Sequence, residues 1–118
     1  MTGRVGLIGL GAMGAGMGRN LLAKTGGLQT MAHRDRAVIE ALVAEGATEH
    51  ADAAGVVAAS DVVVLCLPNS TVVESVMDQM APALRPGQMV IDTGTSALAS
   101  TLALADRLEA LGVDFAEA

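Results

Sequence analysis

Six residues near the N-terminus have the types and spacing needed to hold phosphate groups. They read Gly9-Leu10-Gly11-Ala12-Met13-Gly14, which matches the pattern G-x-G-x-x-G. In this pattern the first glycine permits a tight turn, the second lets the backbone approach a pyrophosphate, and the third lets a helix pack closely on a strand. A helix that begins here would also offer unpaired N–H groups and the positive end of its dipole. The pattern predicts a dinucleotide site, and the alternative is a glycine-rich turn without a ligand.

A second candidate for phosphate binding is Arg34, which follows a predicted strand ending in His33. Sites for NAD usually place an acidic residue here, to accept a hydrogen bond from the ribose 2′-hydroxyl. The planar, permanently charged guanidinium instead suits a 2′-phosphate, and Arg36 is positioned in sequence to assist it. We therefore expect NADP rather than NAD. Asp35 would oppose this if it turned toward the phosphate, and the alternative for Arg34 is a solvated loop charge.

Several other residues have reactive side chains but no partner group in the sequence. Cys66 ends an apolar run with no basic group beside it, so we interpret it as packing rather than as a nucleophile. His33 and His50 lack the spacing of a metal pair, and no metal is expected. Asp92 is interpreted as a turn or cap residue. Gly16 and Gly18 each cost about 1 kcal/mol of helix propensity relative to Ala, which we attribute to close packing of the helix on the sheet.

Strands and helices that alternate along the chain must position these residues. Apolar runs of four to six residues predict strands covered on both faces, and apolar residues at helical spacing predict the helices between them. The predicted strands are Val5 to Leu10, Leu28 to His33, Val62 to Leu67, Gln88 to Asp92 and Val113 to Ala116. The predicted helices are Met13 to Lys24, Arg36 to Glu45, a short alanine-rich helix around Ala51 to Ala59, a helix from Ser70 to about Met80, and Ser96 to Leu111. This alternation indicates βαβ units, a parallel sheet and a single α/β domain over residues 1–118.

Composition excludes several classes of function. A net charge of −6 without a basic cluster argues against nucleic-acid binding, and the longest apolar run is too short to span a bilayer. The 118 residues contain a single cysteine and so no internal disulfide, which favours a reducing, cytoplasmic location.

The glycine loop and the residues after it resemble the N-terminal domain of the β-hydroxyacid dehydrogenases, which include 3-hydroxyisobutyrate dehydrogenase, tartronate semialdehyde reductase and 6-phosphogluconate dehydrogenase. The similarity continues through Met17 and the Asn20-Leu21 pair on the first helix. Three later segments also match the family in order, and they are His33-Arg34-Asp35, Cys66-Leu67-Pro68 and Asp92-Thr93-Gly94-Thr95. The resemblance implies a Rossmann-like three-layer sandwich, with a parallel sheet and helices on both faces, that would be cut after the start of its sixth strand.

The resemblance also implies roles for individual residues. Gly9, Leu10, Gly11, Ala12, Met13 and Gly14 would hold the pyrophosphate, and Arg34 would meet the 2′-phosphate. Leu67 and Pro68 would flank the nicotinamide ribose, with Val72 nearby. Thr95 would lie where cofactor and substrate meet. Gly94 replaces a family serine that can bind a substrate carboxylate, and Ser96 would substitute for it.

No residue of this chain matches the family's catalytic acid/base. That residue is a lysine on a later helix, whereas the only lysine here is Lys24 at the end of the first helix, where it would meet the negative end of the helix dipole. The family's helical substrate and dimerisation domain would also lie beyond position 118. The resemblance therefore implies a chain that binds cofactor without turnover. Its parent would act on a small hydroxy acid, and a homo-oligomer would form only with the missing domain.

Two other functions remain open from the sequence. An imine-reductase-like enzyme has a similar glycine loop and a similar segment around Arg34, but it lacks the catalytic lysine. A stand-alone nucleotide-binding module would have no chemistry of its own. Sequence beyond position 118 would separate the first from a hydroxyacid dehydrogenase, and the intact mass of the protein in a cell extract would test the second.

Overall fold

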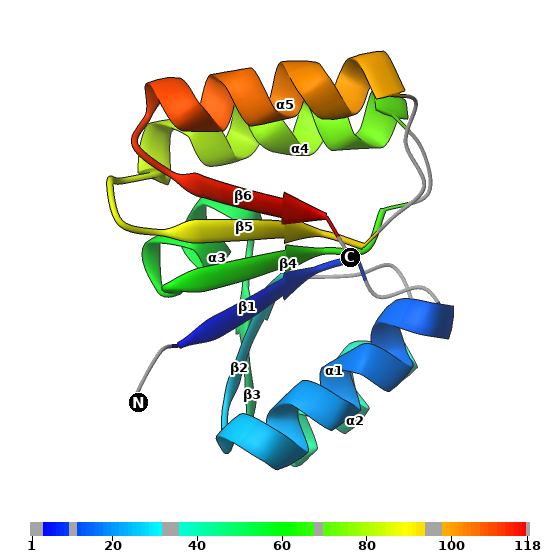
Figure 1. Cartoon of the computed structure of the whole chain (residues 1–118). Coiled ribbons are helices and arrows are strands. Elements are labelled where there is room, and N and C mark those ends of the chain that lie inside the picture. Colours follow the sequence, from blue (N-terminus) through cyan, green and yellow to red (C-terminus); the bar gives the residue numbers. More distant parts are fainter. Residues whose placement is uncertain (1–3, 10–11, 32–35, 68–69, 94–97, 118) are drawn as a thin grey trace.

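The computed structural model describes residues 4–9, 12–31, 36–67, 70–93 and 98–117. In this part of the chain, six parallel strands form one sheet in the order β3-β2-β1-β4-β5-β6 (Figure 1). The strands are β1 Val5–Ile8, β2 Leu28–Met31, β3 Ala47–His50, β4 Val62–Leu65, β5 Met89–Asp92 and β6 Asp114–Glu117. From β1 the chain adds β2 and β3 on one side of the sheet, and then β4, β5 and β6 on the other side. The position between β1 and β4 is therefore the switch point of a doubly wound sheet.

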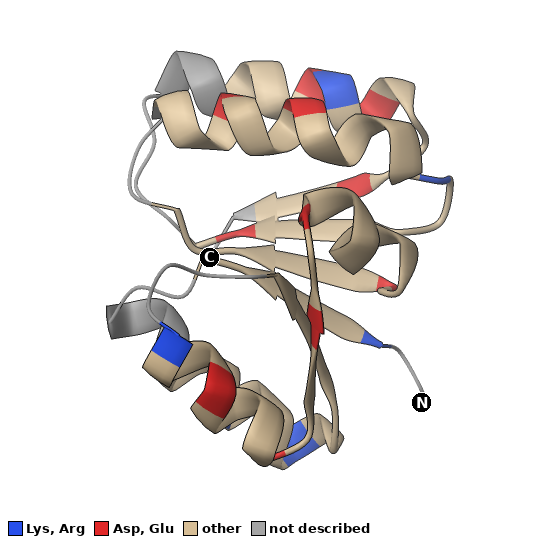
Figure 2. Cartoon of the chain, turned by 180° about the vertical axis from the view of Figure 1, so that it is seen from behind, with Lys and Arg blue, Asp and Glu red and all other residues tan. Residues whose placement is uncertain are grey.

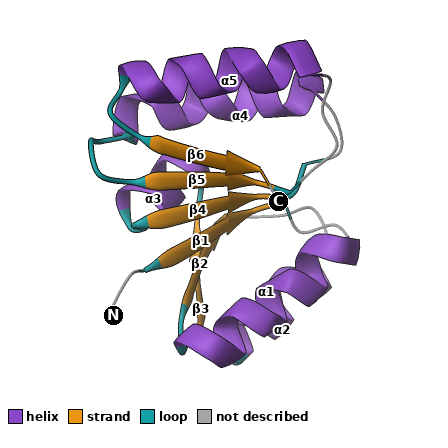
Figure 3. Cartoon of the chain, in the orientation of Figure 1, coloured by secondary structure: helices purple, strands orange, loops and turns teal. Residues whose placement is uncertain are grey.

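Helices cover both faces of the sheet, as the sequence predicts (Figure 3). Helices α1 and α2 lie on one face, and α3, α4 and α5 lie on the other. Their bounds are α1 Ala12–Thr25, α2 Arg36–Ala44, α3 Ala53–Ala58, α4 Ser70–Met80 and α5 Leu98–Ala110, with a short 3₁₀ helix, η1, at Ala81–Ala83. The fold is therefore the three-layer α/β sandwich that the family resemblance implies, with the parallel sheet that the alternation of elements indicates.

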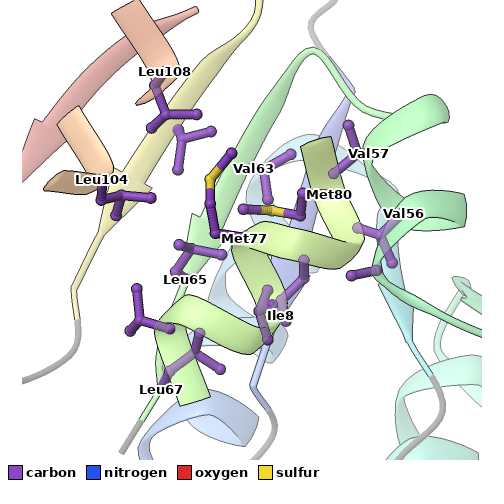
Figure 4. Packing of buried hydrophobic residues seen from close by; sticks show 14 of the residues in the cluster. Ile8, Val56, Val57, Val63, Leu65, Leu67, Met77, Met80, Leu104 and Leu108 are labelled. Atoms are coloured by element: carbon purple, nitrogen blue, oxygen red, sulfur yellow. The ribbon is translucent and has the colours of Figure 1, made fainter. Parts of the chain in front are cut away.

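Two apolar cores stabilise the sandwich, one on each side of the sheet. The larger core joins the sheet to α3, α4 and α5, and Figure 4 shows Met77 and Met80 of α4 packing among its strand residues. The smaller core joins the sheet to α1 and α2. Successive strand residues point to opposite faces, so Leu7 enters the smaller core and Ile8 the larger. A strand buried on both faces must be apolar throughout, which is why β1 and β4 are recognisable in the sequence.

The sequence patterns do not predict strand β3, because residues 46–50 lie between the predicted helices Arg36 to Glu45 and Ala51 to Ala59 and show no apolar run. In the structure Ala47–His50 pairs with β2 at all four positions. Within the described sheet β3 is an edge strand, so one side of its backbone has no neighbouring strand. Much of its side-chain surface is also open to solvent, so its residues need not be apolar. Thr48 is exposed, and Glu49 and His50 are half-buried. The apolar signal used for the other strands is therefore absent from β3.

The last residues of neighbouring strands lie in one row across the sheet. Ile8 pairs with Leu65, Leu65 with Asp92, and Asp92 with Glu117, while Met31 pairs with His50 on the other side. The four residues of β6 all pair with β5. The carboxyl ends of the strands consequently lie along one edge of the sheet, its carboxyl edge.

Charged residues lie mainly along the helices and near the ends of strands, and the Lys and Arg segments are few and separated (Figure 2). Among the described residues, no helix has both the length and the apolar character needed to cross a membrane.

A buried glutamine closes the end of α3. The Gln88 side chain is 2% exposed, and its Nε2 donates to the carbonyl oxygens of Val57 at 2.9 Å and Ser60 at 2.8 Å. Its Oε1 accepts a 2.8 Å bond from the backbone N–H of Arg85. The Arg85 guanidinium reaches the same carbonyls only at 3.3 to 3.5 Å. Gln88 thereby adds short hydrogen bonds to two carbonyls at the end of α3, of which that of Val57 also accepts from the N–H of Ser60 at 3.2 Å.

Replacing Gln88 with leucine is expected to lower the free energy of unfolding by about 2–3 kcal/mol. Leucine preserves the volume but leaves buried polar groups without their best partners, each of which costs about 1–3 kcal/mol. Urea unfolding followed by circular dichroism would measure the loss. Gln79→Leu is the matched control, because Gln79 is exposed on α4 and should change stability by less than about 0.5 kcal/mol. Equal stability of the two variants would contradict the bonding described for Gln88.

Candidate functional site

The glycine loop begins at the switch point of the sheet, directly against the end of β4. Gly9 follows β1 and has a φ of +111°, a conformation that L-residues other than glycine rarely adopt. A Cβ at this position would lie 2.1 Å from the carbonyl oxygen of Cys66 and 3.3 Å from Cδ2 of Leu67. The structure therefore brings together two of the segments singled out in the sequence, and it gives a steric reason for the first glycine.

Backbone hydrogen bonds hold the ends of β1, β4 and β5 side by side. The N–H of Cys66 donates to the carbonyl oxygen of Ile8 at 2.9 Å. The N–H and the hydroxyl of Thr93 both donate to the carbonyl oxygen of Leu65 at 2.8 Å. Asp92, the last residue of β5, is 4% exposed. Hydrogen bonds thus join the ends of β1, β4 and β5 into one framework at the central part of the carboxyl edge.

Helix α1 begins within the glycine motif, so that Ala12, Met13 and Gly14 form its first turn. This turn contains no acidic residue, so no side-chain carboxylate within it offsets the unpaired N–H groups and the positive end of the helix dipole. The arrangement fits a pyrophosphate, which needs donors and positive potential at this point. At the other end of the helix, Lys24 lies in the last turn as expected.

The two further glycines of α1 differ in their surroundings. A Cβ on Gly18 would lie 3.3 Å from Cδ2 of Leu7 and 3.4 Å from Cδ1 of Leu42. Close packing on the sheet, the reason given from the sequence, is therefore confirmed for Gly18. It is wrong for Gly16, which is exposed and would meet nothing within 4 Å.

The other predicted contacts with the cofactor are only partly within the described residues. Leu67 lies at the expected edge, but its side chain is 6% exposed and packs in the larger core. Val72 lies in the first turn of α4 and is half-buried against the same core. The remaining predicted site residues lie outside the described ranges, and these are Leu10, Gly11, Arg34, Pro68, Thr95 and Ser96.

Arg36, which was expected to assist Arg34, is engaged by two carboxylates. Its Nη1 donates to Oε2 of Glu49 at 2.7 Å and its Nη2 to Oε1 of Glu49 at 3.1 Å, while Nε lies 3.9 Å from Oε2 of Glu40. The hydrogen bonds to Arg36 hold the pKa of the Glu49 carboxyl below its usual value, and Glu49 raises the pKa of Arg36. Sequence reasoning missed this cluster, because Glu49 lies on β3, the strand that was not predicted.

A hollow of about 260 Å³ lies away from this edge, between α4 and α5. It is lined by Val73, Glu74, Met77, Asp78, Ala103, Leu104 and Arg107. An ion pair of 2.9 Å between Arg107 and Asp78 lies in this lining. The hollow contains none of the motif residues, so we place the candidate site at the carboxyl edge instead.

Comparison with known proteins identifies the family of this chain. Residues 4–118 match the family described as the NAD binding domain of 6-phosphogluconate dehydrogenase. The chain is 36% identical to 2-(hydroxymethyl)glutarate dehydrogenase of Eubacterium barkeri, with 98% of this chain and 39% of that protein covered. It is 31% identical to mitochondrial 3-hydroxyisobutyrate dehydrogenase of Drosophila melanogaster, with 97% and 35% covered.

The fold is shared with solved oxidoreductase structures. The structure of an imine reductase from Pseudomonas sp. superposes with a TM-score of 0.87 at 25% identity, over 99% of this chain and 41% of that one. The chain thus spans about two fifths of the length of the proteins it matches. The match over residues 4–118 confirms the resemblance inferred from the motifs, and the chain belongs to the NAD-binding domain family of 6-phosphogluconate dehydrogenase and the related β-hydroxyacid dehydrogenases.

Proposed function

We propose that this chain is the NADP-binding domain of an oxidoreductase that interconverts a small 3-hydroxy acid and its semialdehyde or keto form. The observation that carries the proposal is the position of Gly9, which starts a glycine loop at the switch point between β1 and β4. Dinucleotides bind across this crevice in doubly wound sheets. The relatives named above are dehydrogenases of hydroxy acids, which supports the substrate class.

Each predicted residue then has a proposed task. Backbone N–H groups from Gly9 to Gly14 hold the pyrophosphate at the start of α1. Arg34 binds the 2′-phosphate through its guanidinium, and the backbone around Leu67 and Pro68 borders the nicotinamide ribose, with Val72 beside it. Thr95 lies at the junction with the substrate, and Ser96 contacts the substrate. When bound, the nicotinamide supplies or accepts the hydride.

The proton that accompanies the hydride is assigned to no residue of this chain. Lys24, the only lysine, lies at the end of α1, whereas the site lies at the start of that helix. We therefore propose that the 118 residues bind cofactor without turnover, and that the acid/base belongs to a further part of the parent protein. A cytoplasmic, oligomeric parent is part of the same proposal.

A paired titration of the chain with NADPH and NADH tests this function. Fluorescence of the reduced nicotinamide gives a clean signal, because the chain contains no Trp or Tyr. We expect NADPH to bind about tenfold more tightly or better, since hydrogen bonds to a charged group contribute about 1.5–3 kcal/mol. Equal affinities would refute the assignment of Arg34 to the 2′-phosphate but leave the site intact. Binding of neither cofactor would refute the proposal.

An imine reductase is the second candidate, favoured by the structural match to the Pseudomonas protein. Such an enzyme would use the same cofactor site, so cofactor binding alone does not separate the two. The parent protein would separate them by its substrates. Oxidation of 3-hydroxy acids in the presence of NADP supports the first proposal, and reduction of cyclic imines without activity on hydroxy acids supports the second.

A further inference from the structure

Arg36 lies near the carboxyl end of β2, where this type of fold binds the ribose of a dinucleotide. Its positive charge is already paired with the Glu49 carboxylate. It is the first residue of α2, which follows the carboxyl end of β2. Glu49 pairs in the sheet with Thr30, one residue before β2 ends. The ion pair therefore spans the edge at which an acidic residue or an arginine distinguishes NAD from NADP in this type of fold.

The geometry of the pair leaves little positive charge for a ligand. Glu49 occupies two donors of the guanidinium in a bidentate arrangement, the strongest form of this contact. Glu40 lies beside the third nitrogen. Together the three side chains have a formal charge of −1, so the cluster as a whole does not attract a phosphate dianion.

The position of Arg36 is also electrostatically unusual. A cation in the first turn of a helix opposes the helix dipole, which favours anions there, and α2 has no acidic residue in its first turn. Glu49 supplies the compensating charge from a different element, the edge strand β3. The Glu49 carboxylate thus offsets the unfavourable interaction of Arg36 with the helix dipole. Whether Arg36 is available to a ligand depends on the same carboxylate.

We propose that Glu49 is a specificity-determining residue, which lowers the preference for NADP over NAD by holding Arg36 in the ion pair. The inference rests on the proposed function, because it assumes that a dinucleotide lies at this edge. In this proposal Arg34 binds the 2′-phosphate. Arg36 is a second guanidinium nearby, which the ion pair with Glu49 keeps from the phosphate. Loss of the Glu49 charge releases Arg36 toward the phosphate.

Two nucleotide fragments isolate this effect from the rest of the cofactor. Adenosine 2′,5′-bisphosphate has the 2′-phosphate, and adenosine 5′-monophosphate lacks it. In Glu49→Gln we expect the bisphosphate to bind the 118-residue chain about two- to fivefold more tightly, the range for one exposed charged contact. Affinity for the monophosphate should stay unchanged. Isothermal titration calorimetry at low salt measures both constants, and added salt should remove the gain.

Two control variants identify the source of any change. Arg36→Gln combined with Glu49→Gln keeps the formal charge of the cluster at −1, and it should return the affinity for the bisphosphate to the wild-type value. Asp78→Asn removes a carboxylate from another exposed ion pair, with Arg107 on the opposite face of the sheet, and should change neither constant. Melting temperatures of all variants show whether each one is folded.

The outcomes separate this inference from the proposed function. If the wild-type chain binds both fragments and Glu49→Gln leaves their ratio unchanged, Glu49 only attaches α2 to β3 and the inference is overturned. Weaker binding of the bisphosphate in Glu49→Gln also overturns it, since Glu49 would then hold Arg36 in a productive position. If no variant binds either fragment or NADPH, the proposed function itself fails.

Discussion

Replacing Gly9 with alanine is expected to lower the free energy of unfolding by about 3 kcal/mol or more. A residue other than glycine at positive φ costs about 1–3 kcal/mol, and Gly9 has a φ of +111°. The new Cβ would also lie 2.1 Å from the carbonyl oxygen and 2.8 Å from the carbonyl carbon of Cys66. Both are backbone atoms within the β1–β4 framework, so relief requires the two strand ends to separate.

Gly16→Ala provides the matched control, because it makes the same chemical change nearby. Gly16 lies inside α1, is exposed, and has nothing within 4 Å of the added Cβ. Alanine there should stabilise the helix by about 0.5–1 kcal/mol. Urea unfolding monitored by circular dichroism would measure both variants. A Gly9→Ala protein within 1 kcal/mol of the wild type would contradict the geometry at the switch point.

The glycines of this region show which features can be predicted from the sequence and which cannot. The G-x-G-x-x-G pattern correctly predicts a tight turn that needs glycine at Gly9, because its place between an apolar run and a helix specifies the backbone geometry. The sequence does not distinguish Gly16 from Gly18, since both lie in the same helix two residues apart. Only the structure shows that Gly18 faces Leu7 and Leu42 whereas Gly16 faces outward.

The same limit applies to strands. Strands β1 and β4 are predictable because burial on both faces requires consecutive apolar residues, and Leu7 and Val63 are both fully buried. Strand β3 lies at an edge of the described sheet, and the sequence from Ala47 to His50 has only one residue that is clearly buried. The pairing of β3 with β2 is a tertiary contact, for which a short polar segment has no local signature.

Part of the candidate site can likewise be predicted from the sequence, and part of it cannot. The glycine loop and the segment at Cys66 are local motifs, and their approach at the switch point follows from the strand order. The pairing of Arg36 with Glu49 joins residues of α2 and β3 whose contact depends on the register of an unpredicted strand. From the sequence, Arg36 was expected to be available to a phosphate. In the structure two nitrogens of its guanidinium donate to Glu49, so the motif alone does not show whether Arg36 is available to a phosphate.

Replacing Gly11 with aspartate is expected to abolish binding of NADPH while the chain stays folded. Gly11 lies outside the described residues, and the prediction follows from its place as the second glycine of the motif, where the backbone approaches the pyrophosphate. A carboxylate there would collide with the phosphates and repel them. Like charges ~4 Å apart near a protein surface repel by about 4 kcal/mol, which corresponds to roughly a 1,000-fold increase in Kd.

Gly16→Asp is the control for this variant, because it adds the same charge within helix α1, which begins directly after Gly11 in the sequence. Gly16 is exposed and lies in the second turn of α1, about 6 Å along the helix axis from its first residue, Ala12, at ~1.5 Å per residue, where the high dielectric of the solvent weakens the repulsion. We expect its Kd for NADPH to stay within about threefold of the wild type. Fluorescence titration of both variants, with circular dichroism to check folding, decides the matter. If Gly11→Asp binds NADPH like Gly16→Asp, the phosphates do not lie on this loop, and the cofactor site must be sought elsewhere on the carboxyl edge.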